Sequence, residues 1–229
     1  MNDILKKLNE LNPGRNIVSA DDKSFRQYGT IHKRFKIDKL MKYLEKDNQV
    51  KEEVVYIADV PELLNEYGDE LKPIINGVYA GMDVQTGRCL AINNKLNALE
   101  YHQGSETYIS GTDMVMLLGL EQDIVWPKGT YDSSKIKAFY APKGSVIELK
   151  GGCMHFVGIN VYQKEGINVV VMLLKGTNTK FEFNKDQNSQ DKLIIAKNTW
   201  FLAHPEYKQA KDAGYHLGLR GENLTFKTL

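Results

Sequence analysis

Residues 96–110 read L-N-A-L-E-Y-H-Q-G-S-E-T-Y-I-S, and this stretch decides the fold because a glycine turn separates two strand-like runs. Before the turn, Glu100 and His102 are two positions apart, so on a strand their side chains point to the same face. After the turn at Gly104, Glu106 can return toward that face from the next strand. The stretch therefore predicts a pair of strands that gathers one imidazole and two carboxylates.

Similar short runs, rich in Val, Ile, Tyr and Phe, continue on both sides of this stretch. The expected strands are 78–84, 99–102, 107–110, 113–118, 135–140, 146–149, 157–162 and 169–174. Turn signals separate them at 85–87, 104–105, 111, 127–129, 142–144, 151–152 and 166, and 184–191 is expected to be an exposed loop. Strands at this regular spacing predict an antiparallel sandwich or barrel.

The first third of the chain has a helical pattern instead. Apolar residues recur at helical spacing in 4–11 and 36–46, and a third helix is expected from Pro61 to a stop at Gly68. The sequence therefore predicts two parts. Residues 1–76 form a helical N-terminal extension packed on the barrel, and residues 77–229 form a mainly β barrel with a C-terminal segment.

Composition excludes several classes of protein. The chain has 229 residues, of which 42% are hydrophobic and 26% charged, so it is expected to bury a core rather than to be disordered or fibrous. The formal net charge of +1 leaves no electrostatic footprint for nucleic acid or an anionic membrane. No stretch is apolar enough for a signal peptide or a membrane span. With only two cysteines, Cys89 and Cys153, the chain is expected to be cytoplasmic.

A second motif supplies another imidazole. His155 lies in G-G-C-M-H-F, after an expected strand that follows the turn at Pro142-Lys143-Gly144. If a barrel brings Glu100, His102, Glu106 and His155 together, two nitrogen and two oxygen donors form a cage that suits Mn, Fe, Ni, Co or Zn. Glu-x-His alone also occurs as a surface ion pair, and the second motif favours the metal interpretation.

Further polar residues are candidates for the same cavity. Glu148 alternates with Val146, so it faces either the cavity or solvent, and Glu106 and Glu148 are the candidate catalytic carboxylates that move a proton. Lys175, Arg88 and Asn94 are the candidate substrate-binding residues, with plain surface placement as the alternative. Gln85 and Asn93 are candidates for the cavity rim, Cys153 is expected to be buried, and His32 is expected to face solvent. His204 and His216 are expected to have structural roles, and Trp200, Phe201 and Leu202 are expected in the core or in a subunit contact.

The two motifs resemble those of the cupin superfamily, which read H-x-H-x(3,4)-E and, after a P-x-G turn, a single His. Glu100 stands at the first His position, His102 at the second, Glu106 at the Glu, and His155 at the His of the second motif. The resemblance implies a mainly β, cupin-type jelly-roll barrel that holds a divalent metal ion through these four residues.

Two groups within that superfamily are more similar. Ureidoglycolate lyase-like cupins share E-x-H, and their second motif resembles the positions of Val146, Lys150, Gly151 and His155, although Met154 stands where they have another His. An uncharacterised bacterial cupin-like family shares L-N-A-L-E-Y-H, a G-T-N turn and a late H-P-E segment; these are residues 96–102, 176–178 and 204–206. This second resemblance covers most of the chain.

Three functions follow from these observations. The first is a metal-dependent enzyme of the lyase, isomerase or epimerase type, acting on a small hydroxy-carbonyl metabolite such as a sugar or hydroxy acid. The alternatives are a non-catalytic cupin that binds a sugar or metabolite, and a barrel that serves only as a scaffold. The resemblance also implies a homodimer, for which Leu40, Met41 and Leu44 offer apolar surface.

Two carboxylates around an empty site repel each other. In the metal-free protein, the pKa of at least one of these carboxyl groups is therefore expected to be raised.

Overall fold

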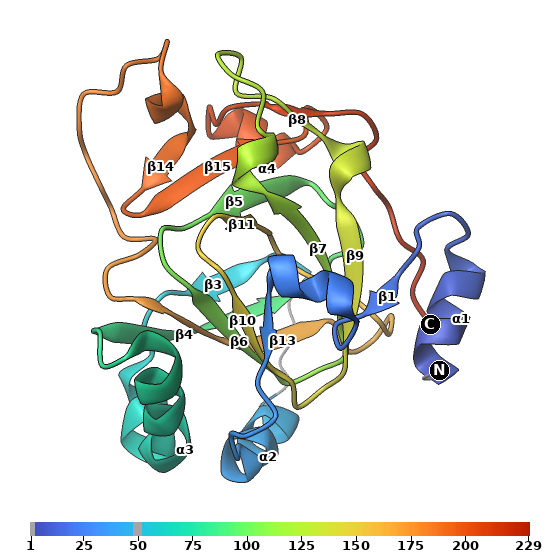
Figure 1. Cartoon of the computed structure of the whole chain (residues 1–229), viewed down its shortest axis with the longest axis vertical. Coiled ribbons are helices and arrows are strands. Elements are labelled where there is room, and N and C mark those ends of the chain that lie inside the picture. Colours follow the sequence, from blue (N-terminus) through green and yellow to red (C-terminus); the bar gives the residue numbers. More distant parts are fainter. Residues whose placement is uncertain (1–2, 48–51) are drawn as a thin grey trace.

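The computed structural model describes residues 3–47 and 52–229, and within them two facing β-sheets form the centre of the molecule (Figure 1). The first sheet has the order β2 (Gly29–Ile31), β10 (Val146–Leu149), β6 (Glu106–Ser110), β13 (Ile167–Leu174), β4 (Val84–Ala91) and β3 (Val55–Ile57). The second contains β1 (Val18–Ser19), β9 (Lys137–Ala141), β7 (Met114–Leu120), β11 (Cys153–Met154) and β12 (Ile159–Asn160), with β5 (Ala98–Tyr101) joined to it by a bridge from Glu100 to His155.

The order of these strands is that of a jelly roll. Eight core strands run in chain order from β4 to β13 when β11 and β12 are counted as one interrupted strand and β8 (Tyr131–Asp132), which belongs to a separate two-stranded sheet, is left out. Numbered 1 to 8 along the chain, they lie side by side in the order 1-8-3-6 in one sheet, which is β4, β13, β6 and β10. In the other sheet the order is 2-7-4-5, which is β5, the interrupted strand β11 and β12, β7 and β9. Two Greek-key connections produce this order in the jelly-roll class, to which cupins belong. The predicted cupin-type barrel is therefore confirmed.

The pleat of the first sheet divides its residues between two cores. On β6, Glu106 and Tyr108 point into the barrel, whereas Ile109 points outward. On β13, Val169 and Val171 join the inner cluster, and Val170 joins the outer one. Because apolar residues occupy both faces, the sheet is buried on both sides, as the hydrophobic effect requires of such strands.

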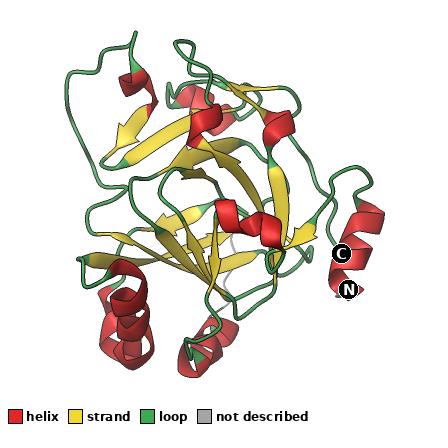
Figure 2. Ribbon diagram, viewed as in Figure 1, coloured by secondary structure: helices red, strands yellow, loops and turns green. Residues whose placement is uncertain are grey.

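Helices cover the outer core, as Figure 2 shows. The helices α2 (Asp38–Lys46) and α3 (Pro61–Tyr79) lie against the outer face of the first sheet, and α1 (Asp3–Leu11) lies beside β1 (Figure 1). Leu40 and Leu44 are fully buried there, and Met41 is partly buried. The apolar surface that the sequence analysis assigned to a partner subunit is thus covered by the barrel itself. Among the described residues, no helix is long and apolar enough to cross a membrane.

The N-terminal third is less purely helical than predicted. The strands β1, β2 and β3 come from it and join both sheets, β1 in parallel to β9 and the other two in antiparallel pairs. Each has only two or three residues, which is too short for an alternating pattern to be visible in the sequence. Residues 1–76 therefore contribute sheet edges as well as the predicted extension.

The predicted stop at Gly68 corresponds to a kink in α3, since Tyr67 has a φ of −117° and a ψ of 19°, which are not helical. A second helical segment that was not predicted follows the kink and ends at Tyr79, with Leu71 and Ile74 fully buried against the sheet. The strand expected at 78–84 starts only at Val84. Strand β4 then runs through residues 85–87, where a turn at Gly87 was expected. At Gly87, a Cβ atom would lie 2.2 Å from the carbonyl oxygen of Ile57, so this glycine allows β3 to approach β4.

The C-terminal segment closes one end of the barrel. It consists of β14 (Ile194–Ala196), β15 (Thr199–Ala203), α4 (Lys208–Asp212) and β16 (Leu219–Arg220), and β16 pairs with β8 (Tyr131–Asp132). Short 3₁₀ helices lie at Lys23–Gln27, Glu121–Asp123, Ser133–Lys135 and Gln190–Leu193. The strand β15 adds to β5 with Phe201 opposite Glu100. Residues 184–191 are mostly exposed, as predicted.

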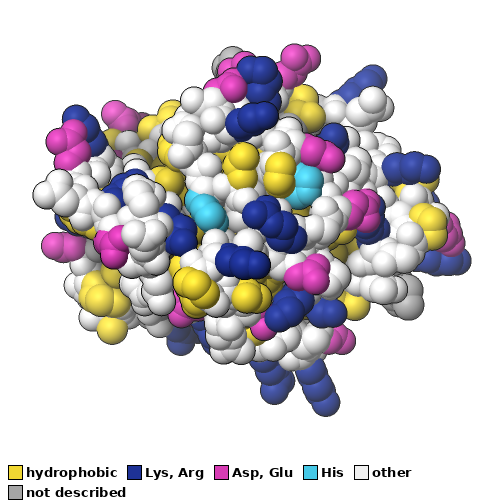
Figure 3. All heavy atoms as spheres, turned by 90° about the horizontal axis from the view of Figure 1, so that it is seen from above, with side chains coloured by type: hydrophobic (Ala, Val, Ile, Leu, Met, Phe, Trp, Pro, Cys, Tyr) yellow, Lys and Arg dark blue, Asp and Glu magenta, His cyan; other side chains and the backbone are white. Residues whose placement is uncertain are grey.

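The two ends of the chain lie side by side (Figure 1). The side chain of Asn12 donates to the carbonyl oxygen of Lys227 at 2.9 Å and accepts from the Lys227 backbone N–H at 2.7 Å. Arg15 also pairs with Glu222. Seen from above, the surface carries basic and acidic side chains side by side, without a large area of one sign (Figure 3). This agrees with the near-zero net charge.

Candidate metal centre

The candidate site begins with a direct pairing of the two sequence motifs. The Glu100 backbone N–H donates to the carbonyl oxygen of His155 at 2.6 Å, and the His155 N–H donates back to Glu100 at 2.9 Å. Residues directly opposite each other in an antiparallel pair project their side chains to the same face. The carboxylate of Glu100, at the first ligand position of the first motif, is therefore adjacent to the imidazole of His155 in the second motif.

Two glycines bring the turns of the motifs into contact. A Cβ atom at Gly151 would lie 2.8 Å from the backbone nitrogen of Gly104, and the Gly152 N–H donates to the carbonyl oxygen of His102 at 3.0 Å. Gly104 also has a φ of +99°, which side chains rarely adopt. The close packing of these turns places His102 beside His155, although the two residues come from different strands.

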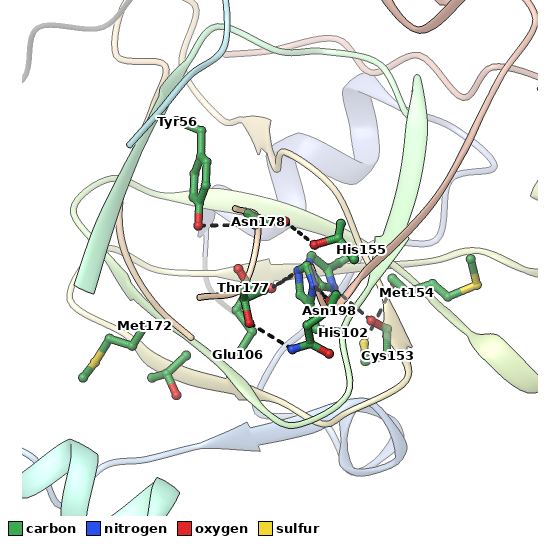
Figure 4. Close-up of polar contacts among 12 residues, drawn as sticks. Tyr56, His102, Glu106, Cys153, Met154, His155, Met172, Thr177, Asn178 and Asn198 are labelled. Atoms are coloured by element: carbon green, nitrogen blue, oxygen red, sulfur yellow. Dashed lines mark hydrogen bonds and ion pairs between the residues drawn. The ribbon is translucent and has the colours of Figure 1, made fainter. Parts of the chain in front are cut away.

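The predicted donors converge in this place, and Figure 4 shows three of them, His102, Glu106 and His155. The ring centroids of His102 and His155 are 5.4 Å apart. The Oε2 atom of Glu106 lies 3.7 Å from Nε2 of His102 and 2.5 Å from Nε2 of His155. One potential ligand atom from each of Glu100, His102 and His155 lies within 4.8 Å of the others. The barrel thus gathers the cage that the sequence predicts.

Backbone carbonyls fix how the two imidazoles face the cage. Nδ1 of His102 donates to the carbonyl oxygen of Asn198 at 2.8 Å, and Nδ1 of His155 donates to that of Cys153 at 2.9 Å. With the hydrogen on Nδ1, a neutral ring presents the lone pair of Nε2 inward. Protein metal ligands are commonly held by such a second hydrogen bond.

The inward atoms have no other partner. Nε2 of His102, Nε2 of His155 and Oε2 of Glu106 are buried, and none has an aligned hydrogen bond within the described residues. The short contact between Glu106 and His155 is an ion-pair distance without hydrogen-bond alignment. Buried polar atoms without partners are rare, and one frequent explanation is an ion that the atoms bind. Two imidazole nitrogens and two carboxylates fit a divalent first-row metal ion, which Glu100, His102, Glu106 and His155 would hold.

The electrostatics of the cage agree with a cation site. Burial raises the pKa of Glu100, which is the raised carboxyl pKa expected from the sequence. Burial acts in the same direction on Glu106, but the neighbouring His155 and His102 outweigh it and lower the pKa of this carboxyl group. Burial alone would lower the pKa of His155, whereas Glu106 and Glu100 raise it to about 9. The carboxylates therefore favour positive charge at this point.

A cavity of about 500 Å³ extends from the cage. Glu100, Glu106 and Tyr108 lie on its wall, which continues along β13 and β7. The C-terminal segment supplies the opposite side through β14, β15 and α4, and β3 supplies part of the rim. The volume is typical of small-molecule sites.

Several predicted residues lie outside this cavity. Glu148 shares the outward face of β10 with Val146, where its carboxylate accepts from Ser105 Oγ at 2.7 Å and contacts Nε2 of His32 at 2.8 Å. It is therefore not placed to move a proton in the cavity. His32 is partly buried in this contact rather than freely solvated.

The three predicted substrate contacts are also elsewhere. Arg88 is buried beneath α2, where it pairs with Asp47 and donates to Asn168 Oδ1 at 2.7 Å. Neither Asn94 nor Lys175 belongs to the cavity wall. Asn94 lies in the connection between β4 and β5, and Lys175 directly follows β13.

The other polar candidates hold the fold together. Gln85 donates to the carbonyl oxygen of Thr177 and accepts from the Gly176 N–H, and Asn93 accepts from Lys95 and donates to Val157. Imidazole nitrogens of His204 and His216 contact the carbonyl oxygens of Gly221 and Gly129. Cys153 is buried outside the cavity wall, and its carbonyl group rather than its sulfur serves the site.

Sequence reasoning missed four polar residues of the site. Tyr108 lies two residues after Glu106 on the same strand face, so strand alternation could have identified it. Tyr56 and Asn178 both line the cavity and are joined by a 3.3 Å contact between the amide Nδ2 and the phenol oxygen (Figure 4). Asn198 orients His102. These last three come from distant segments, and no local pattern marks them.

Comparison with known proteins adds a family and a set of distant structural likenesses. The family model described as a domain of unknown function (DUF4867) matches residues 17–224. No curated protein matches the chain. Similar solved structures include a mutant oxalate decarboxylase of Bacillus subtilis (13% identity, TM-score 0.30, 68% of this chain and 36% of that chain) and vicilin of hazelnut, Corylus avellana (6%, 0.33, 71% and 37%). Procruciferin of Brassica napus is another (7%, 0.32, 69% and 35%). The chain thus spans little more than a third of each.

Proposed function

The chain belongs to the family described as a domain of unknown function (DUF4867), and we propose that it is a metal-dependent enzyme acting on a small molecule in the barrel cavity. Glu100, His102, Glu106 and His155 would hold one divalent cation. The observation that carries the proposal is the convergence of the Nε2 atoms of His102 and His155 on Oε2 of Glu106, at 3.7 and 2.5 Å, with all three atoms buried and without aligned hydrogen bonds. A buried cluster of this kind is stabilised by a cation.

The proposed reaction is of the lyase, isomerase or epimerase type on a hydroxy-carbonyl compound. A bound divalent cation would polarise a carbonyl oxygen and acidify the neighbouring C–H or O–H group. Glu106 is the group best placed to take that proton, because its lowered pKa keeps the carboxylate ionised at neutral pH. Tyr108 lies on the same wall, and burial raises its phenol pKa well above the ordinary value, so it is a neutral hydrogen-bond donor.

A second candidate function is a cupin that binds a metabolite without turnover. The position of Glu148 outside the cavity favours it, since the carboxylates that remain are themselves proposed metal ligands. A screen of sugars and hydroxy acids for turnover by the metal-loaded protein separates the two functions. A cytoplasmic location and a homodimer are further parts of the proposal. The location rests on the sequence, and the homodimer rests on the resemblance to cupins alone, because Leu40, Met41 and Leu44 pack within the protein itself.

Metal content tests the proposal directly. We expect about one equivalent of metal in the purified protein after supplementation with Mn, Fe, Ni, Co and Zn, and strong loss of metal in His102→Ala and His155→Ala. Each variant removes a neutral nitrogen donor. His32→Gln is the matched control, because its imidazole lies outside the cavity beside Glu148. Equal metal content in all four proteins, or none in the supplemented wild type, would contradict the proposal.

A further inference from the structure

Within residues 3–47 and 52–229, the charged side chains on the cavity wall are of only one sign. Among the described residues that line it, Glu100 and Glu106 are the charged ones, and no lysine or arginine joins them. Arg88 is already paired with Asp47 beneath α2. A ligand that carries its own carboxylate or phosphate would therefore find no lysine or arginine to pair with among the described residues of the wall. Burial of an unpaired charge is unfavourable.

The remaining wall is mainly apolar. Ile167, Val169 and Val171 of β13 and Met114 of β7 form the barrel side. Few amides reach the cavity; those of Asn178 and Gln209 are on its wall. The other polar groups of the wall are the two carboxylates and the hydroxyl groups of Tyr56, Tyr108, Tyr207 and Tyr215. An apolar ligand body would replace water over the larger, apolar part of the wall.

The side opposite β13 is aromatic. Phe156 contacts Phe201 and Tyr207 edge to face, with ring centroids 5.7 and 6.0 Å apart, and Phe201 contacts Tyr215 at 5.2 Å. All four rings line the cavity. Aromatic side chains provide flat contact area that favours a ring or an alkyl group over a hydrated polar group.

We propose that the substrate is an uncharged molecule with an apolar body, cyclic by preference, and two adjacent oxygen donors at the end that reaches the cage. This inference deepens the proposed function and rests on it for the metal. Two carboxylates and a divalent cation sum to no net charge if both imidazoles are neutral. The site therefore offers little attraction to a small dianion and a large apolar surface to a ring.

Two chelators with the same head group test the apolar body. Zinc is first titrated into the protein by calorimetry, and benzohydroxamate and acetohydroxamate are then compared on the zinc-loaded protein. We expect benzohydroxamate to bind at least tenfold more tightly, because only its ring contacts the apolar wall. Oxalate, a chelating dianion, is expected to bind more weakly than both. Equal binding of the two hydroxamates, or oxalate binding as tight as that of benzohydroxamate, overturns the inference.

Variants of the wall test the charge argument. Val171→Lys places an ammonium group on the inner face of β13, and Val171→Met has a similar length without the charge. Oxalate is expected to bind at least tenfold more tightly to the lysine variant than to the methionine variant. Gln209→Lys places the charge on an exposed residue of the wall and is used with Gln209→Met if the first variant does not fold. Equal oxalate affinity within a folded pair would contradict the charge argument.

A metal-independent comparison separates the failure of this inference from that of the proposed function. Benzamide and benzoate have the same ring and differ in charge, and neither needs a metal to enter the cavity. If zinc does not bind, the proposed metal site fails. Ligand-observed NMR that shows at least tenfold preference for benzamide then still supports an uncharged apolar ligand, and equal binding of benzoate overturns it.

Discussion

Asn198 controls the orientation of His102 although 96 positions separate them. Its backbone carbonyl accepts the hydrogen bond from Nδ1 of His102, and its side chain exchanges hydrogen bonds with the backbone of Gln103 at 2.9 and 3.1 Å. It also donates to Thr177 Oγ1 at 2.9 Å. The residue has a φ of +55°, a conformation that asparagine tolerates better than most residues. One residue thus fixes both a turn and a candidate ligand.

Substitution of Asn198 is expected to weaken metal binding without removing a ligand. Asn198→Gly keeps the carbonyl group that accepts from His102 but loses the side-chain hydrogen bonds that hold this group in place. Its metal affinity should therefore fall by about tenfold, the lower end of the effect of outer hydrogen-bond partners. Asn198→Ala should lose more, since alanine at this φ adds backbone strain of about 1 kcal/mol. Competition between the protein and a zinc-sensitive dye measures both. Wild-type affinity in both variants would show that His102 is oriented by other contacts.

The sequence was sufficient for the cage but not for the rest of the cavity, and the reason is physical. Glu100, His102 and Glu106 lie within one local motif, so spacing alone related them. Glu148 and Arg88 were misplaced because alternation shows that two residues share a face without showing which face is inward. Helices cover the outer face of the first sheet with a second apolar core, so both faces look alike in the sequence.

At the scale of elements, helix α2 is held to the sheet by a buried polar contact. Arg88 of β4 bonds to Asp47, which follows the helix, and to Asn168 of β13. Its hydrogen bond with the Tyr43 hydroxyl, at 2.9 Å, reaches the helix itself. The long strands and most helices of the fold were predictable because their patterns extend over many residues. The short strands β1, β2 and β3 were not, since their partners and not their own sequences define them.

Removal of this contact is expected to destabilise the protein and to spare the metal centre. Arg88→Ala should lower the free energy of unfolding by about 3 kcal/mol, because it leaves buried polar partners unpaired. Zinc affinity should not change, as Arg88 lies outside the cavity wall. Lys175→Ala is a control expected to stay within about 0.5 kcal/mol of the wild type in urea unfolding. If Arg88→Ala left the stability unchanged and weakened ligand binding, Arg88 would instead be a substrate-binding residue.

For the whole molecule, the metal would act as a clamp between the two motifs. Its proposed ligands come from β5, from the start of β6 and from the segment after β11, so it would connect parts of both sheets. A ligand that binds only the folded state stabilises that state by mass action. The jelly roll should therefore be more stable when the cage is filled.

Thermal unfolding measures this effect. Zinc at 100 times its dissociation constant adds about 2.7 kcal/mol, which for a chain of this length corresponds to a rise in Tm of about 5–10 °C. Calorimetric scans with zinc and with a chelator should show this difference. The double variant His102→Ala/His155→Ala should show none. The same rise in the double variant would mean that zinc stabilises the protein from another place.

The distant position of Asn198 also has a consequence for biosynthesis. A ribosome adding about 5–20 residues per second needs about 5–20 s to advance over the 96 positions from His102 to Asn198. During that interval the nascent chain already contains Glu100, His102 and Glu106, but the carbonyl group that orients the imidazole of His102 has not yet been synthesised. Strand β15, which pairs with β5, follows still later. The arrangement of the cage described above is therefore completed only after Asn198 and β15 have been synthesised.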